Sequence, residues 1–249
     1  MVKTKQLPTR QRVRKALLLF SFLVFPLTLY YFSPVLILQG ASEGVLNGSA
    51  LVFGSMFVAS LFVGRLWCGW ACPAGALQEF AEPVNAHRTS RMITWIKWAV
   101  WIPWVALIVV MAVRAGSFRA VEPLYQMEGG VTVAQPYWYV IYFIVVAVFL
   151  GLALVLGRRA GCHTICWMAP FMVIGRWIRN RVGWASLRLV AEPAQCTDCQ
   201  TCTRNCPMSL DVNAMVHKAT MEDGECILCG SCVDGCPRKT IRFSFSRGR

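Results

Sequence analysis

The sequence predicts an α-helical membrane protein with four transmembrane helices and a small, cysteine-rich α+β domain at its C-terminal end. Three observations support this fold class. The 249 residues are 56% hydrophobic with a mean hydropathy of +0.51, and only 15% are charged, against about 25% in ordinary soluble domains. Long apolar runs fill the N-terminal part of the chain, and the cysteines gather in short-spaced groups, most of them near the C-terminus.

Four apolar runs form the predicted membrane domain. A helix needs roughly 20 apolar residues to cross the hydrocarbon core of a bilayer, and each run has about this length. Prolines 26, 34 and 103 lie inside these runs, which is tolerated where neighbouring helices satisfy the freed carbonyl groups. The predicted spans are Ala16–Gln39, Ala50–Trp67, Met92–Val113 and Tyr137–Leu156.

The basic residues predict the orientation of these spans. The net charge of +13 would favour nucleic acid in a soluble protein, but here the charges flank the spans, and we expect no nucleic-acid partner. The loop 40–49 has no basic residue, whereas Arg158 and Arg159 follow the fourth span. Six basic residues and no acidic residue precede the first span: Lys3, Lys5, Arg10, Arg12, Arg14 and Lys15.

The positive-inside rule therefore predicts a multi-pass protein of the prokaryotic cytoplasmic membrane, in contact with lipid, with both termini and the C-terminal domain in the cytoplasm. A cleaved signal peptide is the alternative for the first run. We disfavour it because the run is too long and no small-x-small cleavage site follows it directly.

The expected domains are a four-span membrane domain at 1–160, an interfacial linker at 161–190 and a cysteine-rich domain at 191–249. Tryptophan and arginine alternate in Met168–Val190, which is typical of a short interfacial helix, although an ordinary linker would also fit. Apolar residues alternate in Thr240–Phe245, which predicts a closing strand.

Two copies of one four-cysteine pattern define the C-terminal domain. Each copy reads Cys-x-x-Cys-x-x-Cys-x-x-x-Cys-Pro, and the two copies lie thirty residues apart, at 196–207 and 226–237. Three cysteines so spaced can hold three corners of an iron–sulfur cube, and in two-cluster ferredoxins the fourth cysteine ligates the other cluster. Zinc and a secreted disulfide scaffold are the alternatives, and both fit two complete copies poorly.

This spacing predicts two [4Fe–4S] clusters in a bacterial two-cluster ferredoxin-like domain, with ligands crossed between the two motifs. Cluster 1 is assigned to Cys196, Cys199, Cys202 and Cys236. Cluster 2 is assigned to Cys226, Cys229, Cys232 and Cys206.

Two further cysteine pairs lie at the predicted cytoplasmic edge of the membrane. Cys68 and Cys72 close the second span, and Cys162 and Cys166 follow the fourth. Residues four apart share one face of a helix, so each pair can present two sulfurs together. Four such thiols could hold a further metal centre or form redox-active dithiols, and packing of small residues at helix ends is the alternative.

The stretch Gly64-Arg65-Leu66-Trp67-Cys68-Gly69-Trp70-Ala71-Cys72-Pro73, the second edge pair and the double cysteine motif together resemble the NapH-type membrane-bound polyferredoxins. That family includes membrane components of quinol dehydrogenases, and nitrous-oxide-reduction regulators and methylamine-utilisation proteins are related to it. The resemblance covers nearly the whole chain. One departure is Cys166-Trp167, where the family pattern has Cys-Pro.

The resemblance implies electron transfer between the quinone pool and a partner redox subunit, so that the chain is an electron-transfer subunit of an oxidoreductase rather than an enzyme alone. The expected cofactors are the two [4Fe–4S] clusters, with a further metal centre or a quinone left open at the membrane edge. Glu79, Glu82 and His87 are candidate proton acceptors for quinol oxidation. The alternative function is redox sensing or the assembly and maturation of a respiratory enzyme.

Overall fold

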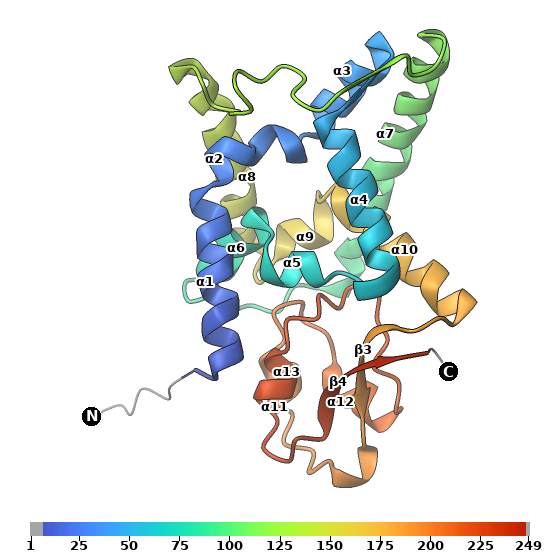
Figure 1. Ribbon diagram of the computed structural model, residues 1–249. Helices are drawn as coiled ribbons and strands as arrows, with labels where there is room; N and C mark the ends of the chain where they lie inside the picture. The colour runs from blue at the N-terminus through green and yellow to red at the C-terminus, as the bar shows by residue number, and fades with distance from the viewer. Residues whose placement is uncertain (1–6, 248–249) are drawn as a thin grey trace.

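The computed structural model describes residues 7–247 of the chain. Long helices form the upper half of the molecule in Figure 1, and a small domain with one two-stranded sheet forms the lower half. The N-terminal helix descends toward the lower half, so that the basic residues from Arg10 to Lys15 lie near the junction of the two halves. Lys3 and Lys5 lie outside the described residues.

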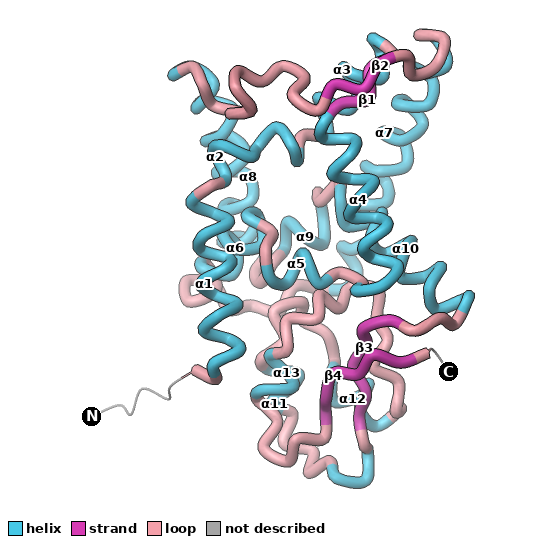
Figure 2. The backbone as a smooth tube through the Cα atoms, in the orientation of Figure 1, coloured by secondary structure: helices cyan, strands magenta, loops and turns pink. Residues whose placement is uncertain are grey.

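The upper half consists of helices of very different length. Its elements are α1 (Thr9–Leu23), α2 (Phe25–Thr28), η1 (Leu29–Phe32), α3 (Pro34–Glu43), β1 (Val45–Asn47), α4 (Gly48–Val63), α5 (Leu66–Trp70), α6 (Pro73–Phe80), η2 (Arg91–Thr94), α7 (Trp95–Arg114), β2 (Ala120–Glu122), η3 (Pro136–Trp138), α8 (Tyr139–Leu156), α9 (Ala160–Thr164) and α10 (Met168–Val182). Strands β1 and β2 form a short parallel pair at the top of Figure 2.

Within residues 7–247, two helical segments are long and apolar enough to cross a membrane, Arg91–Arg114 and Pro136–Leu156. A third candidate combines Thr9–Leu23 with Phe25–Phe32, which meet at an angle of 61°. The second predicted span, Ala50–Trp67, corresponds to α4, whose 16 residues make a helix about 24 Å long, shorter than the hydrocarbon core. The structure thus supports two or three of the four predicted spans.

The first predicted span, Ala16–Gln39, is wrong as a single helix. Pro26 cannot donate a backbone hydrogen bond, and the helix breaks beside it, at Val24. Pro34 starts a new helix, α3, for which the Ser33 hydroxyl accepts a capping bond from the Leu36 amide at 3.3 Å. Hydropathy records an unbroken apolar run here but does not register the two bends.

The lower half is the α+β cysteine-rich domain. Strand β3 (Ser186–Ala191) begins inside the stretch that we expected to be linker and pairs with β4 (Ile241–Ser246) in antiparallel register, Ser186 opposite Ser246. The predicted closing strand is thereby confirmed. The remaining elements are η4 (Pro193–Gln195), α11 (Thr201–Arg204), α12 (Val212–His217) and α13 (Ser231–Asp234).

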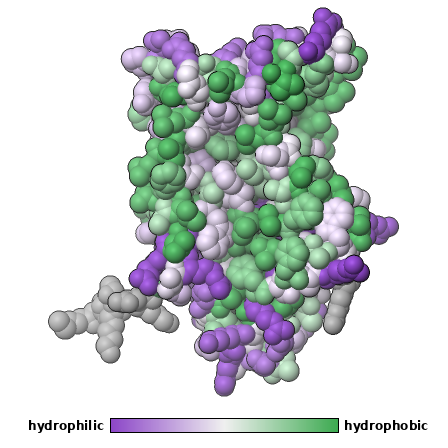
Figure 3. All heavy atoms as spheres, in the orientation of Figure 1, coloured by the Kyte–Doolittle hydropathy of each residue, from purple (hydrophilic) through white to green (hydrophobic). Residues whose placement is uncertain are grey.

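The two halves of the molecule differ in the hydrophobicity of their surfaces. Hydrophobic side chains cover the middle of the upper half in Figure 3, and hydrophilic side chains gather at its upper and lower ends and on the small domain. Large apolar residues that face outward include Val113, Phe143 and Val155 on α7 and α8. Such outward-facing apolar residues along α7 and α8 are consistent with contact between these helices and lipid.

An aromatic cluster stabilises the upper half where α4, α7 and α10 meet. The ring of Phe171 on α10 lies 5.0 Å from Trp101 and 5.8 Å from Phe53, both in edge-on contact. Trp104 lies 5.2 Å from Trp167. Aromatic rings in this arrangement contribute about 0.5–1.5 kcal/mol per pair beyond the burial of their area. The cluster holds α10 against the segment that bears Cys166.

Candidate functional site

The eight cysteines of the double motif line two separate cavities of the lower half. One cavity contains three cysteines of the first motif and the last cysteine of the second: Cys196, Cys199, Cys202 and Cys236. The other contains three of the second motif and the last of the first: Cys226, Cys229, Cys232 and Cys206. The chain thus brings the cysteines together in the crossed sets that the spacing predicts, and both sets suit a four-thiolate cluster.

The two cavities differ in exposure. Cys206, Cys229 and Cys232 are buried, whereas Cys199 is exposed. The buried set lies beside the upper half, because the loop 227–229 contacts the residues around Gly69. The exposed set lies at the far end of the lower domain. The buried set is therefore the one whose loop contacts the edge cysteine segment.

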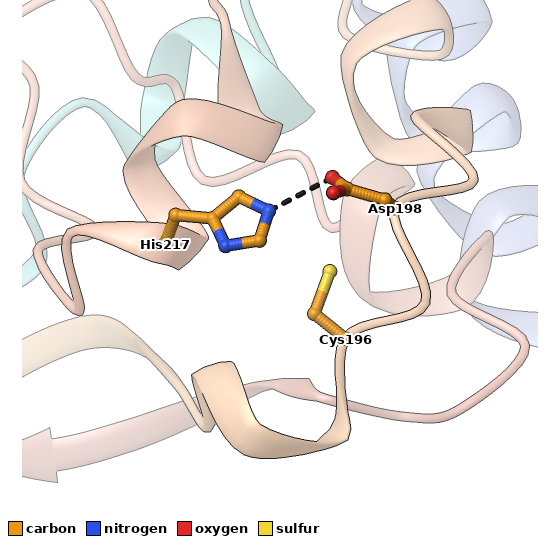
Figure 4. Close-up of side chains that lie close together, drawn as sticks. All are labelled: Cys196, Asp198 and His217. Atoms are coloured by element: carbon orange, nitrogen blue, oxygen red, sulfur yellow. Dashed lines mark hydrogen bonds and ion pairs between the residues drawn. The ribbon is translucent and has the colours of Figure 1, made fainter.

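Asp198 and His217 lie beside Cys196 and hold the loop of the exposed set (Figure 4). The ring of His217 is 2.8 Å from a carboxylate oxygen of Asp198, and Asn213 donates to the same oxygen at 2.7 Å. Hydrogen bonds from Asn213 and His217 lower the pKa of Asp198. His217 and Asn213 both belong to α12, so this pair ties the cysteine loop to a helix.

The four edge cysteines lie in two short helices and in the residues that follow them, in the lower part of the upper half (Figure 1). Cys68 is in α5 and Cys72 caps α6, whereas Cys162 is in α9 and Cys166 precedes α10. Each of these thiols lies within electrostatic reach of others of the group. The structure thus places the four edge cysteines in one group.

Burial dominates the surroundings of these thiols. Cys68 and Cys162 are each 4% exposed. Burial, and then the neighbouring thiols Cys162 and Cys68, raise the pKa of Cys166 to about 12. Gln78 donates a hydrogen bond to the Cys162 sulfur at 3.5 Å and accepts one from the Gly161 amide at 2.7 Å. Helix α6 of the first pair therefore also positions the second pair.

Two buried ion triads flank the edge cysteines, and sequence reasoning missed both. Glu79 lies between Arg14 and Arg159, at 2.6 Å from the Arg159 guanidinium, and all three side chains are buried. Burial alone raises the pKa of Glu79, but Arg159 and Arg14 lower it to about 2. Glu79 is thus ionised at neutral pH and tightly paired, which makes it a poor proton acceptor.

Glu225 forms the second triad with Arg65, at 2.7 Å, and with Lys97. All three side chains are again buried. Burial raises the pKa of Glu225, but the charges of Arg65 and Lys97 lower it to about 2. Arg65 and Arg159 each stand three residues before the first cysteine of a pair, a regularity that is visible in the sequence. Their acidic partners come from distant segments, which the sequence does not reveal.

The loop of the first edge pair docks directly on the loop of the buried ferredoxin set. The indole of Trp70 donates to the Leu228 carbonyl at 3.0 Å, and Gln11 donates to the Cys229 carbonyl at 3.1 Å. Gly69 packs so tightly that an added Cβ would lie 2.3 Å from the Ile227 carbonyl oxygen. Only glycine permits this approach of the two backbones.

An apolar cavity of about 300 Å³ reaches the edge cysteines from the side of the long helices. Cys72 and Cys166 contribute to its wall. The rest of the lining comes mainly from the η1–α3 region, α4 and α8, and includes Phe25, Tyr30, Ser33, Phe53, Val145, Phe149 and Trp167. A volume of this order, with an apolar wall and a few polar groups, is typical of sites for small organic ligands.

Comparison with known protein families identifies two iron–sulfur regions. Residues 48–89 match a family described as "4Fe-4S binding domain", and residues 195–241 match one described as "4Fe-4S dicluster domain". The first match contains Cys68 and Cys72, and the second contains all eight cysteines of the double motif. The chain therefore carries 4Fe–4S-binding regions of the ferredoxin type.

Curated proteins similar to the chain include several with redox names. YccM of Escherichia coli, named as an electron transport protein, is 22% identical over 85% of this chain. The methylamine utilization ferredoxin-type protein MauN of Methylobacillus flagellatus is 26% identical over 78% of this chain and 69% of its own length. Protein RdxA of Cereibacter sphaeroides is 23% identical over 92% of this chain.

The chain spans 60% of the length of YccM and 50% of the length of RdxA. No solved structure matches the chain. At this level of identity, the similarity is to electron-transport and ferredoxin-type proteins as a group. The fold and the two family matches agree on a mostly helical chain that bears 4Fe–4S-binding regions and apolar helices of membrane-spanning length.

Proposed function

We propose that the protein is a membrane-bound iron–sulfur electron carrier that passes electrons between a quinone in the lipid phase and a redox partner. The observation that carries the proposal is the linear order of three features: an apolar cavity against the edge cysteines, the docking of the edge loop on the buried ferredoxin set, and an exposed ferredoxin set at the far end. Electron tunnelling weakens steeply with distance, so direct contacts at each junction favour this route.

The eight cysteines of the double motif are the proposed ligands of two [4Fe–4S] clusters, in the crossed sets given above. Their cavities and the matched dicluster family support this assignment. When bound, such clusters supply one-electron transfer. The loops supply four sulfurs to each, and α12 and β4 hold the exposed set in place.

The cavity beside Cys72 and Cys166 suits the ring of a quinone. Aromatic side chains such as Phe25 and Phe149 offer flat apolar contacts, and the Ser33 hydroxyl offers a polar one. Oxidation of a quinol yields one quinone, two electrons and two protons. Glu79 is held by two arginines and does not take a proton, so the protons leave by another group or by water.

The exposed end of the lower domain is the proposed contact for the redox partner. Cys199 is exposed there, and the side chains of Arg204, Arg238 and Lys239 around it are exposed as well. A basic rim steers an acidic protein toward the site and speeds its association at low salt. The basic residues from Arg10 to Lys15 support a cytoplasmic position for both termini and for this end.

Reduction by a quinol tests the proposal. The full chain is placed anaerobically in lipid nanodiscs, a reduced menaquinone analogue is added, and the loss of iron–sulfur absorption is followed. Filling the cavity with Val145→Trp is expected to abolish reduction by the quinol while reduction by dithionite and iron content stay unchanged. The control is Val155→Trp, on the same helix but 77% exposed and outside the cavity wall.

Clusters that exchange electrons with no quinol or quinone, although dithionite reduces them, would overturn the quinone part. That result would favour the alternative of a redox sensor or of an assembly factor for a respiratory enzyme.

A further inference from the structure

The two edge pairs belong to two half-sites of the same design. In each, a long helix ends at a glycine with positive φ, Gly64 at 57° and Gly157 at 98°. A buried arginine follows, Arg65 or Arg159, and then a five-residue helix that contains the first cysteine. The second cysteine lies four residues later, just before the next helix, α6 or α10.

The half-sites pack reciprocally. Helix α10, which follows the second half-site, packs against α4, which precedes the first. Helix α6, which follows the first half-site, packs against α8, which precedes the second. The Arg159 guanidinium also donates to the Cys68 carbonyl at 2.6 Å. This exchange brings two sulfurs from each half into one four-thiol site with approximate two-fold symmetry.

The charges around this site do not balance. Each triad has two cations and one carboxylate, so the two triads bury two positive charges in excess. Buried charges are costly unless a partner compensates them. Arg65 lies within electrostatic reach of Cys68 and Cys166, and Arg159 within reach of Cys162 and Cys72. A group with two negative charges among these four sulfurs would complete the balance.

Hydrogen-bond donors around the site also lack partners. Within the described residues, Nε and Nη2 of Arg65, Nε of Arg159, Nε2 of His163 and Nε1 of Trp67 are buried and have no acceptor. An unsatisfied buried donor costs about 1–3 kcal/mol. Sulfur atoms of iron–sulfur clusters accept such N–H groups, and these bonds set the reduction potential. Arg65 and Arg159, which each keep unpaired N–H groups, belong to the two triads that carry the excess charge.

The buried ferredoxin set has comparable surroundings. Glu222 is shared by Arg176, Arg179 and Arg188, which again leaves two positive charges in excess. The Arg176 guanidinium donates to the Cys226 carbonyl at 2.9 Å. A [4Fe–4S] core of charge 2+ with four thiolates carries two negative charges, which would compensate this excess. The edge site has the same combination of four cysteines and two excess positive charges, but it is built by helices of the upper half.

We infer that Cys68, Cys72, Cys162 and Cys166 together ligate a third iron–sulfur centre, whose 2+ core and four thiolates are compensated by the two ion triads. The inference rests on the proposed function, because it names the first electron acceptor beside the apolar cavity. Each step at this centre takes up one electron and releases one to the buried ferredoxin set. No proton is bound by the ligands.

Geometry favours a polynuclear centre over a single metal ion. A tetrahedral zinc site with Zn–S bonds of 2.3 Å has sulfurs about 3.8 Å apart. Among the described residues, which include all four edge cysteines, no three of these sulfurs lie within 4.8 Å of one another. The cysteines of the double motif are spread in the same way. The iron–sulfur family matched at 48–89 supports the same choice.

Iron and acid-labile sulfide analysis of the anaerobically purified full chain tests the inference. Two [4Fe–4S] clusters give about eight irons per chain, and a third centre raises this to about ten or twelve, depending on whether it holds two or four irons. Cys68→Ser and Cys166→Ser are each expected to lose only this surplus, with the EPR signals of the ferredoxin clusters retained. The control is Met172→Leu, whose buried sulfur lies 3.9 Å from that of Cys68.

A second variant decides the question if the serine variants do not fold. Arg65→Lys keeps the positive charge but removes the unpaired guanidinium donors, so it is expected to shift the potential of the third centre to a more negative value and leave the ferredoxin potentials unchanged. An iron content of about eight in the wild type, or stoichiometric zinc, overturns the inference. Failure of quinol reduction with the surplus iron present would overturn the quinone proposal alone.

Discussion

At the scale of the residue, the contact of Gly69 with the ferredoxin loop leaves no room for a side chain. A side chain at this position meets a backbone carbonyl at 2.3 Å and not a flexible group. The loop must therefore move if any larger residue is present. Because Gly69 lies next to Cys68, this movement lengthens the path between the edge cysteines and Cys229.

We predict that Gly69→Val slows reduction of the ferredoxin clusters by quinol about 10-fold or more, the effect of a barrier raised by about 1.4 kcal/mol. Iron content is expected to stay unchanged. Stopped-flow absorption measures the rate. The matched control is Gly54→Val on α4, where an added Cβ meets nothing within 4 Å. Equal rates in both variants would show that electrons do not pass at Gly69.

A second residue-scale prediction concerns Glu79. Its replacement by glutamine leaves Arg14 and Arg159 buried without a counter-ion, which costs about 3–5 kcal/mol. Glu82→Gln removes a partly exposed ion pair with Arg158 and is expected to cost no more than about 1 kcal/mol. Chemical denaturation in detergent measures both. Similar losses in the two variants would contradict the assigned role of the triad.

The pKa of Glu79 sets the pH dependence of this contribution. The folded pKa of about 2 lies below the ordinary value of 4.5. A lowered carboxyl pKa stabilises the folded state above the unfolded pKa, and the contribution is lost as the pH falls through the folded pKa. The difference in stability between the wild type and Glu79→Gln is thus expected to shrink between about pH 4.5 and 2.

At the scale of the element, the close packing of α10 on α4 determines where Cys166 lies. An added Cβ at Gly175 would lie 1.9 Å from the Ser60 hydroxyl. We predict that Gly175→Ala costs about 1–3 kcal/mol through overpacking. The double variant Ser60→Ala with Gly175→Ala is expected to recover part of this loss, since the contacting oxygen is gone. A double-mutant cycle on unfolding measures the coupling, and additive losses would contradict it.

The elements also show which parts of the fold can be predicted from the sequence. The eight cysteines of the double motif predict the ferredoxin domain, because their spacing is set by local loop geometry. The α7 and α8 spans follow from hydropathy alone. The break near Pro26 and the short α4 do not, because composition ignores where a helix bends or ends. Glu225 pairs with Arg65 and Lys97, which are distant in the sequence, so no local sequence pattern predicts this pairing.

At the scale of the whole molecule, the proposed orientation makes a direct prediction. The loop between α7 and α8 lies at the end opposite the ferredoxin domain in Figure 1. An alkaline phosphatase fusion after Met127 is expected to be active, because this enzyme folds only outside the cytoplasm, and a fusion at the C-terminus is expected to be inactive. Activity at both points, or the reverse pattern, would contradict the orientation. A fluorescent-protein fusion at each point serves as the complementary control.

The reciprocal packing of the half-sites has a consequence for the synthesis and membrane insertion of the protein. The ribosome makes Cys68 and Cys72 early, but the helices that complete their surroundings, α8 and α10, are made much later. If synthesis or insertion stops between the two pairs, the chain has only two of the four sulfurs. The triad around Glu79 then also lacks Arg159. Only a fully inserted chain would therefore bind the third centre. The iron content of the protein would distinguish complete molecules from incomplete ones.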